Sequence, residues 1–431
     1  MESNKSIFKA ISLFGSVQGL NILLNLVRTK IVAQLLGPAG IGLNKIFNEI
    51  REFIHSTSNL GMDICGVSGI SKAYDTLSKA TNEEEQIQYQ AKLEQEVCLV
   101  RSWVMILALF GVVLCMALSH VIWLLFPDGT SPMDFVWLSP AVGLSTIACG
   151  EMAVLKGIRK LKVLASVSVI NVLLAIIISL PLYWAFEING VLPAIILLCL
   201  AQAIVVAIIS YRYQAPRFNF KSGPLRAGIP MLQLGFSFAL AGVVNHFTQL
   251  GIASYLSNEG GTHLVGLYSA GFTIVMVYLG GVFFASLDSD YFPRLASIFQ
   301  DCSNRRETVW RQIRMTALIV IPVTILIIVL LPWILPLLFS NEFNDVIFMT
   351  QIAACSLFFR SVYLPLAYIP LAAGDSKIYF VLELVSYIML AAGVIVGYHF
   401  LQLTGTGIGI LVSSCLDMVI LLFVSRIKYK I

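Results

Sequence analysis

The chain alternates between long apolar runs and short polar connections. The runs stay apolar over about 20 residues, the length that a helix needs to cross the hydrocarbon core of a bilayer. They lack the period-two alternation of transmembrane β-strands. The pattern therefore predicts membrane-spanning helices and disfavours a β-barrel. Twelve spans are expected, over residues 8–33, 41–66, 98–125, 134–155, 163–186, 190–210, 228–256, 264–289, 315–339, 344–372, 378–400 and 406–425.

The composition supports a membrane location. Hydrophobic residues make up 58% of the 431 residues and charged residues only 12%, whereas soluble domains carry about 25% charged residues. A soluble surface this poor in charge would aggregate. The composition excludes a cytosolic enzyme, a disordered chain and a secreted disulfide scaffold, and it favours an all-α polytopic membrane protein.

Most of the 28 Lys and Arg residues lie in alternate connections between the predicted spans. By the positive-inside rule, the basic side faces the cytoplasm, so both termini are expected there. The Glu-rich segment 67–97 on that side is predicted to be a short cytoplasmic helix or a flexible linker. The connections on the opposite side contain no Lys or Arg; they are 34–40, 126–133, 187–189, 257–263, 340–343 and 401–405.

A weak internal repeat divides the chain into halves. The Gly42–Leu43 pair, which ends GPAGIGL, recurs as Gly266–Leu267 at the end of GGTHLVGL, 224 residues later. Six predicted spans separate the two. We therefore expect two pseudo-symmetric six-helix lobes, residues 1–210 and 228–431, joined by a cytoplasmic linker over 211–227. Such parallel repeats place a central cavity at the lobe interface, as in transporters.

Polar residues form rows on the first two predicted spans, although these helices are predicted to lie within the membrane. On the first span they recur at helical spacings of three and four, which places them on one face; they are Gln18, Asn21, Asn25 and Arg28. On the second span, Glu52 and Asp63 belong to a similar row, and Arg51 and His55 lie beside it. Two such helices indicate a shared hydrated cleft. The alternative for the second span is an interfacial amphipathic helix.

The second half carries matching candidates. Asn245 and Gln249 lie on one row of the seventh span, and His246 lies beside them. Arg360 stands near the middle of the tenth span, too far from either end to reach an interface. An intramembrane arginine is expensive and normally faces a cavity or an ion partner. Arg360 is therefore interpreted as a cavity residue or as the partner of an acid on a neighbouring helix. The two histidines could equally be hydrogen-bonded packing residues.

Four intramembrane acids are candidates for ion coupling by protons or sodium, or for pairing with a basic residue: Glu52, Asp63, Glu383 and Asp417. No nucleotide-binding loop, zinc-protease motif, nucleophile elbow or dinucleotide fingerprint occurs. The eight cysteines form no CxxC pair. We therefore expect no catalytic residues, metal site, cofactor or nucleic-acid partner.

Four short segments carry a family resemblance: GPAGIGL after the first span, LKGIR after the fourth, YFPRLASIF after the eighth and SNEF after the ninth. In order and spacing they resemble the polysaccharide flippases of the multidrug/oligosaccharidyl-lipid/polysaccharide exporter (MOP) superfamily. The likeness is greatest to flippases of the type that handles lipid III of enterobacterial common antigen and to O-antigen flippases. It extends from residue 8 to about residue 425. A relative would carry Arg where this chain has Asn48, so head-group contacts are expected to differ.

The resemblance implies twelve helices, a cationic cavity and a location in the bacterial inner membrane. It implies movement of an undecaprenyl-pyrophosphate-linked oligosaccharide to the periplasmic leaflet by alternating access, with membrane lipids and polysaccharide polymerases as further partners. Arg28, Arg51 and Arg360 are assigned to the cavity from helical position, not by transfer from the family. A multidrug or small-molecule exporter of the same fold is the main alternative. A polytopic glycan polymerase is disfavoured, because it needs a sizeable periplasmic loop.

Overall fold

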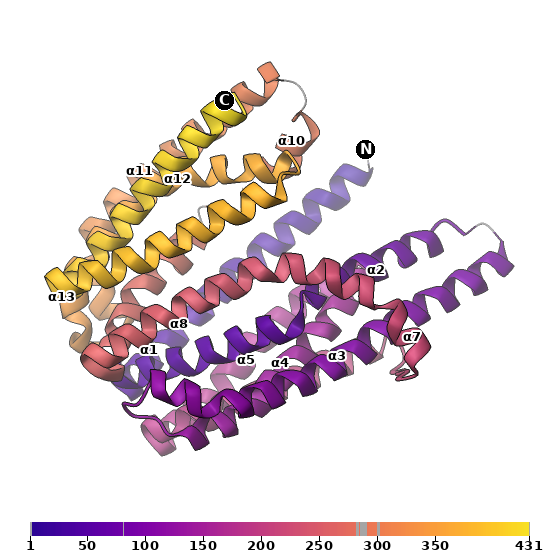
Figure 1. Cartoon of the computed structure of the whole chain (residues 1–431), viewed down its shortest axis with the longest axis horizontal. Helices are drawn as coiled ribbons and strands as arrows, with labels where there is room; N and C mark the ends of the chain where they lie inside the picture. The colour runs from indigo at the N-terminus through magenta and orange to yellow at the C-terminus, as the bar shows by residue number, and fades with distance from the viewer. Residues whose placement is uncertain (1, 81, 282–283, 285–290, 300–301, 431) are drawn as a thin grey trace. The chain divides into compact units, whose positions relative to one another are not determined.

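The computed structural model describes residues 2–80, 82–281, 284, 291–299 and 302–430. Every regular element within these ranges is a helix, as Figure 1 shows. The elements are α1 (Glu2–Asn59), α2 (Met62–Leu77), α3 (Glu83–Leu125), α4 (Pro132–Gly157), α5 (Leu161–Phe186), η1 (Glu187–Gly190), α6 (Val191–Tyr211), α7 (Ser222–Ala227), α8 (Ile229–Phe272), η2 (Thr273–Leu279), α10 (Phe292–Ser297), α11 (Cys302–Leu338), η4 (Asn341–Val346), α12 (Ile347–Ala372) and α13 (Ser376–Lys428).

Three of the long helices contain a break. The backbone leaves helical geometry at Gly37 in α1, at Gly260–Gly261 in α8 and at Leu401–Gln402 in α13. Each break falls in a connection predicted between two spans. In the described part of the chain, seven helical segments are long and apolar enough to cross a membrane, and those ending at Tyr211, Leu279 and Lys428 each contain a turn. The protein is thus an all-α, multi-pass membrane protein, and the count of twelve spans stays a prediction.

The turns in the two halves have the same backbone geometry. Gly37 has φ 60° and ψ −171°, and Gly261, 224 residues later, has φ 67° and ψ −171°. Both lie at positive φ, where glycine avoids the steric cost of a side chain. Farther along, Glu187 (φ 49°, ψ −130°) and Gln402 (φ 51°, ψ −138°) also match. The turns at corresponding places in the two predicted halves therefore share their backbone conformation.

The repeated glycines also contact one another. A Cβ atom on Gly42 would lie 1.8 Å from the carbonyl oxygen of Thr262, and one on Gly266 would lie 1.8 Å from that of Pro38. The contact is reciprocal, because Pro38 and Thr262 stand at the same 224-residue spacing. Only glycine at both positions permits so close a backbone approach, as in small-residue helix crossings in membranes. The repeated glycines thus pack symmetrically against each other, within one compact unit of the chain.

The chain forms two compact units. The first comprises the residues up to Leu36 together with Ile46–Leu250, and the second comprises Gly37–Lys45 together with the chain from Gly251 onward. Within the first unit, α4 packs against α2, α3 and α6. Within the second unit, α12 packs against α11 and α13.

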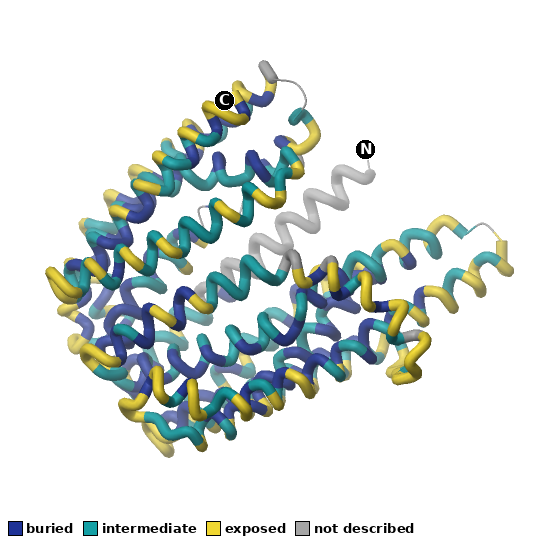
Figure 2. Tube along the Cα trace, in the orientation of Figure 1, coloured by how far each residue is buried: buried dark blue, intermediate teal, exposed yellow. Residues whose placement is uncertain are grey.

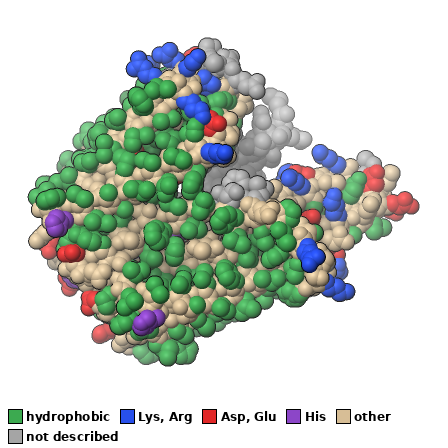
Figure 3. Space-filling model, viewed as in Figure 1, with side chains coloured by type: hydrophobic (Ala, Val, Ile, Leu, Met, Phe, Trp, Pro, Cys, Tyr) green, Lys and Arg blue, Asp and Glu red, His purple; other side chains and the backbone are tan. Residues whose placement is uncertain are grey.

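The burial of each helix reflects the number of helices that pack around it. In the most apolar stretch of α4, 61% of residues are buried, whereas the value for the stretch in α11 is 22%. Small and polar residues such as Gly143, Thr146 and Gly150 let α4 be surrounded by protein. The tube in Figure 2 shows the buried segments in dark blue. Hydrophobic side chains cover much of the face in Figure 3. Leu318 and Leu326 on α11 are among the exposed large hydrophobic residues. Such a surface suits contact with lipid.

The second predicted span, 41–66, is not one continuous helix. It ends at Asn59, and α2 begins at Met62 after Leu60 and Gly61, both at positive φ. A Cβ atom on Gly61 would lie 2.1 Å from the carbonyl oxygen of Gly235 in α8, so the break lies at a close helix crossing. The segment 67–97 is largely helical, because α2 continues to Leu77 and α3 starts at Glu83.

Candidate functional site

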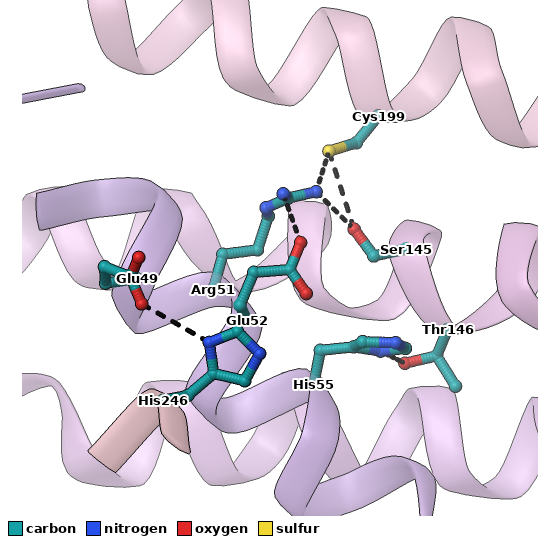
Figure 4. A network of polar contacts seen from close by, with 8 residues as sticks. All are labelled: Glu49, Arg51, Glu52, His55, Ser145, Thr146, Cys199 and His246. Carbon is teal, nitrogen blue, oxygen red and sulfur yellow. Dashed lines mark hydrogen bonds and ion pairs between the residues drawn. The ribbon is translucent and has the colours of Figure 1, made fainter. Parts of the chain in front are cut away.

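A polar network lies on the part of α1 that follows Gly37, within the first unit. Figure 4 shows its members: Glu49, Arg51, Glu52, His55, Ser145, Thr146, Cys199 and His246. They come from α1, α4, α6 and α8. The α1 residues fall within two helical turns, so their side chains fan out toward the three neighbouring helices. The network joins four candidates of the sequence, namely Arg51, Glu52, His55 and His246.

The guanidinium group of Arg51 is the centre of the network. Its Nη1 donates to Oγ of Ser145 at 3.0 Å and to Sγ of Cys199 at 3.3 Å, and its Nη2 donates to Oε1 of Glu52 at 2.6 Å. The Arg51 side chain is 16% exposed and that of Glu52 is 37% exposed. The Nε atom is enclosed and has no hydrogen-bond partner among the described residues.

The two histidines make separate contacts. Nδ1 of His246 lies 3.3 Å from Oε2 of Glu49, and Nδ1 of His55 lies 3.0 Å from Oγ1 of Thr146. The rings of Phe53 and Phe247 pack at 5.8 Å beside them. A histidine with one identified hydrogen bond keeps a second ring nitrogen for another partner. The network therefore presents a guanidinium group and two imidazole rings, each with hydrogen-bonding capacity left for a further partner.

Polar contacts continue to the helix break. Nδ2 of Asn59 donates to Oδ1 of Asp63 at 3.3 Å and lies 3.9 Å from Sγ of Cys149. Asp63 is half-buried in the first turn of α2. A carboxylate there is favoured by the helix dipole. Asp63 thus lies near the network along the chain but beyond the break at Leu60–Gly61.

The polar row of the first predicted span contacts α5. Nδ2 of Asn21 donates to Oγ of Ser168 at 2.8 Å, and Arg28 hydrogen-bonds to the hydroxyl of Tyr183. Asn25 lies between them and is half-buried. The side chain of Gln18 lies outside the described residues. The structure therefore places Asn21 and Arg28 against a helix of the same unit.

The candidates on α8 differ in burial. Asn245 is half-buried, whereas Gln249 is 8% exposed. The amide oxygen of Gln249 has no hydrogen-bond partner among the described residues. Buried polar atoms are normally satisfied, so this oxygen is available to a donor from a ligand or from water. Both residues belong to the first unit, as His246 does.

Arg360 belongs to the second unit. It lies near the half-buried acids Glu383 and Asp417 of α13, whose electrostatics it influences, and its guanidinium carbon is 5.8 Å from the ring centre of Tyr363. Glu383 hydrogen-bonds to Tyr379 and Tyr387. Arg360 makes no ion pair within 4 Å with an acid that the structure describes. The nearby acids thus balance its charge without a direct ion pair among the described residues. This arrangement lies between the two roles predicted for Arg360, a cavity residue and the ion-pair partner of an acid on a neighbouring helix.

The two acids line a small enclosed space. A cavity of about 10 Å³ is bordered by residues that include Tyr363, Glu383 and Asp417. That volume accommodates about one water molecule. Within the described residues, no group of three or more His, Cys, Asp or Glu residues has the arrangement of a metal site. The cluster around Arg360 thus consists of one cation, two carboxylates and several hydroxyl groups.

One charged pair was missed by sequence reasoning. Arg101 of α3 and Glu151 of α4 form a bidentate ion pair, with both oxygens at 2.9 Å, and their side chains are 2% and 5% exposed. The positive-inside rule accounts for Arg101 as a basic residue near the cytoplasmic end of its predicted span, and Glu151 lies near the same end of the next span. The available signal was their positions, because both stand near the same end of consecutive predicted spans.

Comparison with solved structures identifies the fold. An inward-facing multidrug resistance transporter of the MATE family, in the MOP superfamily, is similar with a TM-score of 0.76 and 15% identity over 98% of each chain. The lipid II flippase MurJ, in an inward closed conformation, has a TM-score of 0.69 and 16% identity over 96% of this chain and 87% of that chain. A MOP superfamily transporter from Pyrococcus furiosus has a TM-score of 0.61 and 14% identity, and the coverage is 98% and 94%. The fold is that of the MOP-type transporters.

The family follows from the sequence itself. Residues 82–348 match the model of a family described as polysaccharide biosynthesis protein. The match spans more than half of the chain, so the chain belongs to this polysaccharide biosynthesis protein family. No curated protein matches the sequence.

Proposed function

We propose that the protein is a flippase that moves an undecaprenyl-pyrophosphate-linked oligosaccharide from the cytoplasmic to the periplasmic leaflet of the bacterial inner membrane. The product would serve cell-surface polysaccharide synthesis, of the enterobacterial common antigen or O-antigen kind. Two facts support the proposal together. The chain belongs to a polysaccharide biosynthesis family, and its fold is also that of a lipid II flippase.

The observation that carries the proposal is the incomplete hydrogen bonding of the half-buried Arg51. It is a half-buried arginine in a membrane helix, and one edge of its guanidinium group is incompletely bonded among the described residues. Pyrophosphate cannot cross a bare bilayer, and arginine binds phosphate oxygens through paired, charge-assisted hydrogen bonds. Arg28 and Arg360 supply further positive charge in the proposal. The polyprenyl tail stays in the lipid.

The amide side chains are assigned to the sugars. Asn21, Asn25, Asn245 and Gln249 offer donors and acceptors of the type that sugar hydroxyls bind, and Gln18 is included from its place on the same row. Rocking of the two halves alternates access to the two leaflets. In this proposal the protein is a transporter without catalytic residues, and a polysaccharide polymerase receives the translocated lipid.

Ion coupling is assigned to the intramembrane acids. Asp63 and Glu52 in the first unit, and Glu383 and Asp417 in the second, are half-buried carboxylates. Such groups mark proton or sodium pathways in transporters. Replacing each acid by its amide tests the assignment in vesicles with an imposed proton or sodium gradient. The coupling acid is the one whose amide variant loses gradient dependence while it keeps basal translocation.

The decisive experiment is reconstitution of the full chain in liposomes with a fluorescent undecaprenyl-pyrophosphate-linked oligosaccharide. Movement between leaflets is followed by quenching with a membrane-impermeant reagent. Wild-type protein should accelerate translocation, and Arg51→Ala should reduce the rate at least about tenfold, which corresponds to an activation free energy higher by about 1.4 kcal/mol. Arg159→Ala is the matched control, because Arg159 forms an exposed pair with Asp75 outside the network.

A multidrug exporter is the second candidate. Three acids, Glu49, Glu52 and Asp63, lie on or next to the same polar row as Arg51, and carboxylates suit cationic drugs better than pyrophosphate. The same liposomes distinguish the candidates. Efflux of a cationic dye together with an unaltered rate of lipid translocation relative to empty liposomes would reject the flippase and support the exporter.

A further inference from the structure

The two edges of the Arg51 guanidinium group are bonded unequally. Nη1 is fixed by Oγ of Ser145 and Sγ of Cys199, and these two atoms also contact each other at 3.6 Å. The opposite edge consists of Nη2 and Nε. Nη2 holds one oxygen of Glu52 at 2.6 Å, whereas Nε is enclosed and unpartnered among the described residues. One edge is therefore saturated and the other is half used.

The half-used edge has the geometry that oxyanions prefer. The Nε and Nη2 atoms of arginine point two parallel N–H groups in one direction, and a phosphate or carboxylate fills both in a bidentate contact. Glu52 fills only one. The reason is local: residues adjacent on a helix point about 100° apart and do not face each other. Glu52 therefore reaches the guanidinium group from the side.

The two partners also differ in their freedom to move. The side chain of Glu52 is 37% exposed and that of Arg51 is 16% exposed. Arg51 is tethered to α4 and α6 by its other edge, whereas Arg51 is the hydrogen-bond partner identified for the Glu52 carboxylate. Rotation of the Glu52 side chain frees the edge of Arg51 without moving the arginine.

We propose that Glu52 is a resident counter-ion that a phosphate or pyrophosphate group displaces from Arg51. In the unloaded state Glu52 neutralises the arginine within the membrane, where an unpaired charge is costly. In the loaded state two phosphate oxygens occupy Nη2 and Nε, and the Glu52 carboxylate turns toward solvent. The proposal rests on the proposed function, because it names the group that this site takes from the lipid-linked substrate.

Competition by Glu52 weakens binding in a defined way. The ligand binds only the fraction of molecules in which the edge is free, so the apparent dissociation constant is raised by the inverse of that fraction. A moderate affinity lets a transporter release its cargo on the far side. Glu52 thus sets affinity, whereas Arg51 makes the contact.

Binding of inorganic pyrophosphate to the full chain in detergent, measured by titration calorimetry, tests the proposal. Glu52→Gln keeps the size of the side chain and removes its charge, and it should tighten binding about three- to tenfold if the free edge is a minor state. Arg51→Lys should abolish the gain, because an ammonium group lacks the bidentate edge. The double variant Arg51→Lys with Glu52→Gln should bind no better than Arg51→Lys alone.

Two further variants separate displacement from a general charge effect. Glu49→Gln removes a carboxylate from the same network, where it pairs with His246, and should tighten binding less than Glu52→Gln does. Glu94→Gln removes a carboxylate from an arginine pair outside the network, with Arg217, and should leave binding unchanged. Equal gains from Glu49→Gln and Glu52→Gln overturn the proposal, as does unchanged affinity in Glu52→Gln. Absence of pyrophosphate binding in both wild type and Glu52→Gln overturns it as well.

The source of the phosphate group is resolved by the ligand used. Inorganic phosphate, inorganic pyrophosphate and undecaprenyl pyrophosphate are titrated in parallel. A site for the lipid carrier should bind the lipid-linked group most tightly, and a site for free anions should bind all three alike. Thermal unfolding in detergent confirms that each variant is folded.

The translocation assay keeps this proposal distinct from the proposed function. If the protein translocates the lipid but Glu52→Gln does not tighten pyrophosphate binding, the counter-ion role is rejected and the proposed flippase function is retained. If Glu52→Gln tightens pyrophosphate binding but the protein does not translocate the lipid, the flippase function is rejected and Arg51 remains an oxyanion-binding site.

Discussion

Arg51 and Arg101 are two arginines of the same unit that are bonded very differently. Arg101 is 2% exposed, and each of its three nitrogens has a partner: both oxygens of Glu151, the carbonyl oxygens of Gln214 and Ala215 at 3.1 and 2.6 Å, and Oγ of Ser210 at 3.2 Å. Arg51 leaves one nitrogen without an identified partner, and another bonds to the half-buried Glu52 carboxylate. A saturated arginine holds structure together, whereas a half-saturated one can still bind a ligand.

The neighbours of Arg101 show what it stabilises. Oγ of Ser102 accepts from the backbone N–H of Asn219 at 2.8 Å, and Nε1 of Trp103 donates to the carbonyl oxygen of Leu225 at 3.2 Å. Three consecutive residues of α3 thus fasten the segment that follows α6. The predicted linker over 211–227 is attached along one helix, and we propose that it moves as part of the first unit.

The largest effect is expected from Glu151→Ala, which leaves the Arg101 charge buried without its carboxylate. Breaking a buried pair on one side typically costs about 3–5 kcal/mol. We expect a large fall in folded yield and in the thermal unfolding midpoint, measured by size-exclusion chromatography and a thermal shift in detergent. Asp75→Ala is the control, because it breaks an ion pair whose side chains are 40% and 57% exposed, where the cost is about 0–1 kcal/mol.

A similar small loss in both variants would remove the distinction between a saturated anchor and an exposed pair. It would mean that water or a neighbouring group compensates Arg101 once Glu151 is shortened. The comparison between Arg101 and Arg51 would then rest on binding alone.

Arg51→Lys is expected to separate function from stability. It loses the bidentate edge but keeps the positive charge, so stability should change by no more than the loss of one or two hydrogen bonds, each about 0.5–1.5 kcal/mol. Lipid translocation should fall between wild type and Arg51→Ala. Initial rates and unfolding midpoints are measured on the same preparation. If the translocation rate and the unfolding midpoint fall together, Arg51 has a structural role, as Arg101 has.

The all-helical, membrane-spanning fold was predictable because it depends on hydrophobic run length. The breaks at Gly37, Gly261 and Gln402 fall in predicted connections, and the 224-residue glycine spacing has a structural counterpart in the Gly42–Gly266 contact. The break at Leu60–Gly61 was not predictable. The row of polar residues keeps helical spacing across it, and the break coincides with a close approach of Gly61 to Gly235, which helical spacing does not reveal.

The site was predictable only in part, for the same reason. Helical spacing identified Arg51, His55 and His246 as polar residues of membrane helices, and the structure brings them into one network. It could not identify the partners, because Ser145 and Cys199 read as ordinary small residues of α4 and α6. Likewise, the positive-inside rule explains Arg101 without any partner, so the pair with Glu151 remained hidden until the two helices were placed side by side.

Trp103→Phe is expected to have a moderate and local effect. It removes the hydrogen bond to the Leu225 carbonyl while it keeps an aromatic ring near Gly228, whose added Cβ would lie 2.3 Å from Nε1. The loss should be about 0.5–1.5 kcal/mol and should raise hydrogen exchange in α7. Trp184→Phe is the control, because Trp184 is 77% exposed. Unchanged exchange in α7 would show that Arg101 and Ser102 alone hold the segment.

The smallest effect is expected at an exposed carboxylate that links two ends of α13. Oδ2 of Asp375, just before α13, accepts from the Tyr429 hydroxyl at 2.7 Å and lies 3.1 Å from Nζ of Lys428. The hydrogen bond from Tyr429 and then that from Lys428 lower the pKa of Asp375 below its usual value of 3.8. A carboxyl group with a lowered pKa in the folded state stabilises that state above its unfolded pKa, and the contribution is lost as the pH falls through the folded value.

Asp375→Asn should therefore resemble wild type in unfolding midpoint near pH 7, to within the small range of exposed pairs. Wild type should lose its C-terminal attachment only below about pH 4, as the carboxyl group is protonated. In the variant the attachment should not depend on pH in this range. Susceptibility of the residues after Lys428 to an acid-stable carboxypeptidase, compared at pH 3 and pH 6, measures the difference. A wild-type tail equally protected at both pH values would mean that the Arg305 contact with the Tyr429 carbonyl, at 2.7 Å, holds the tail without Asp375.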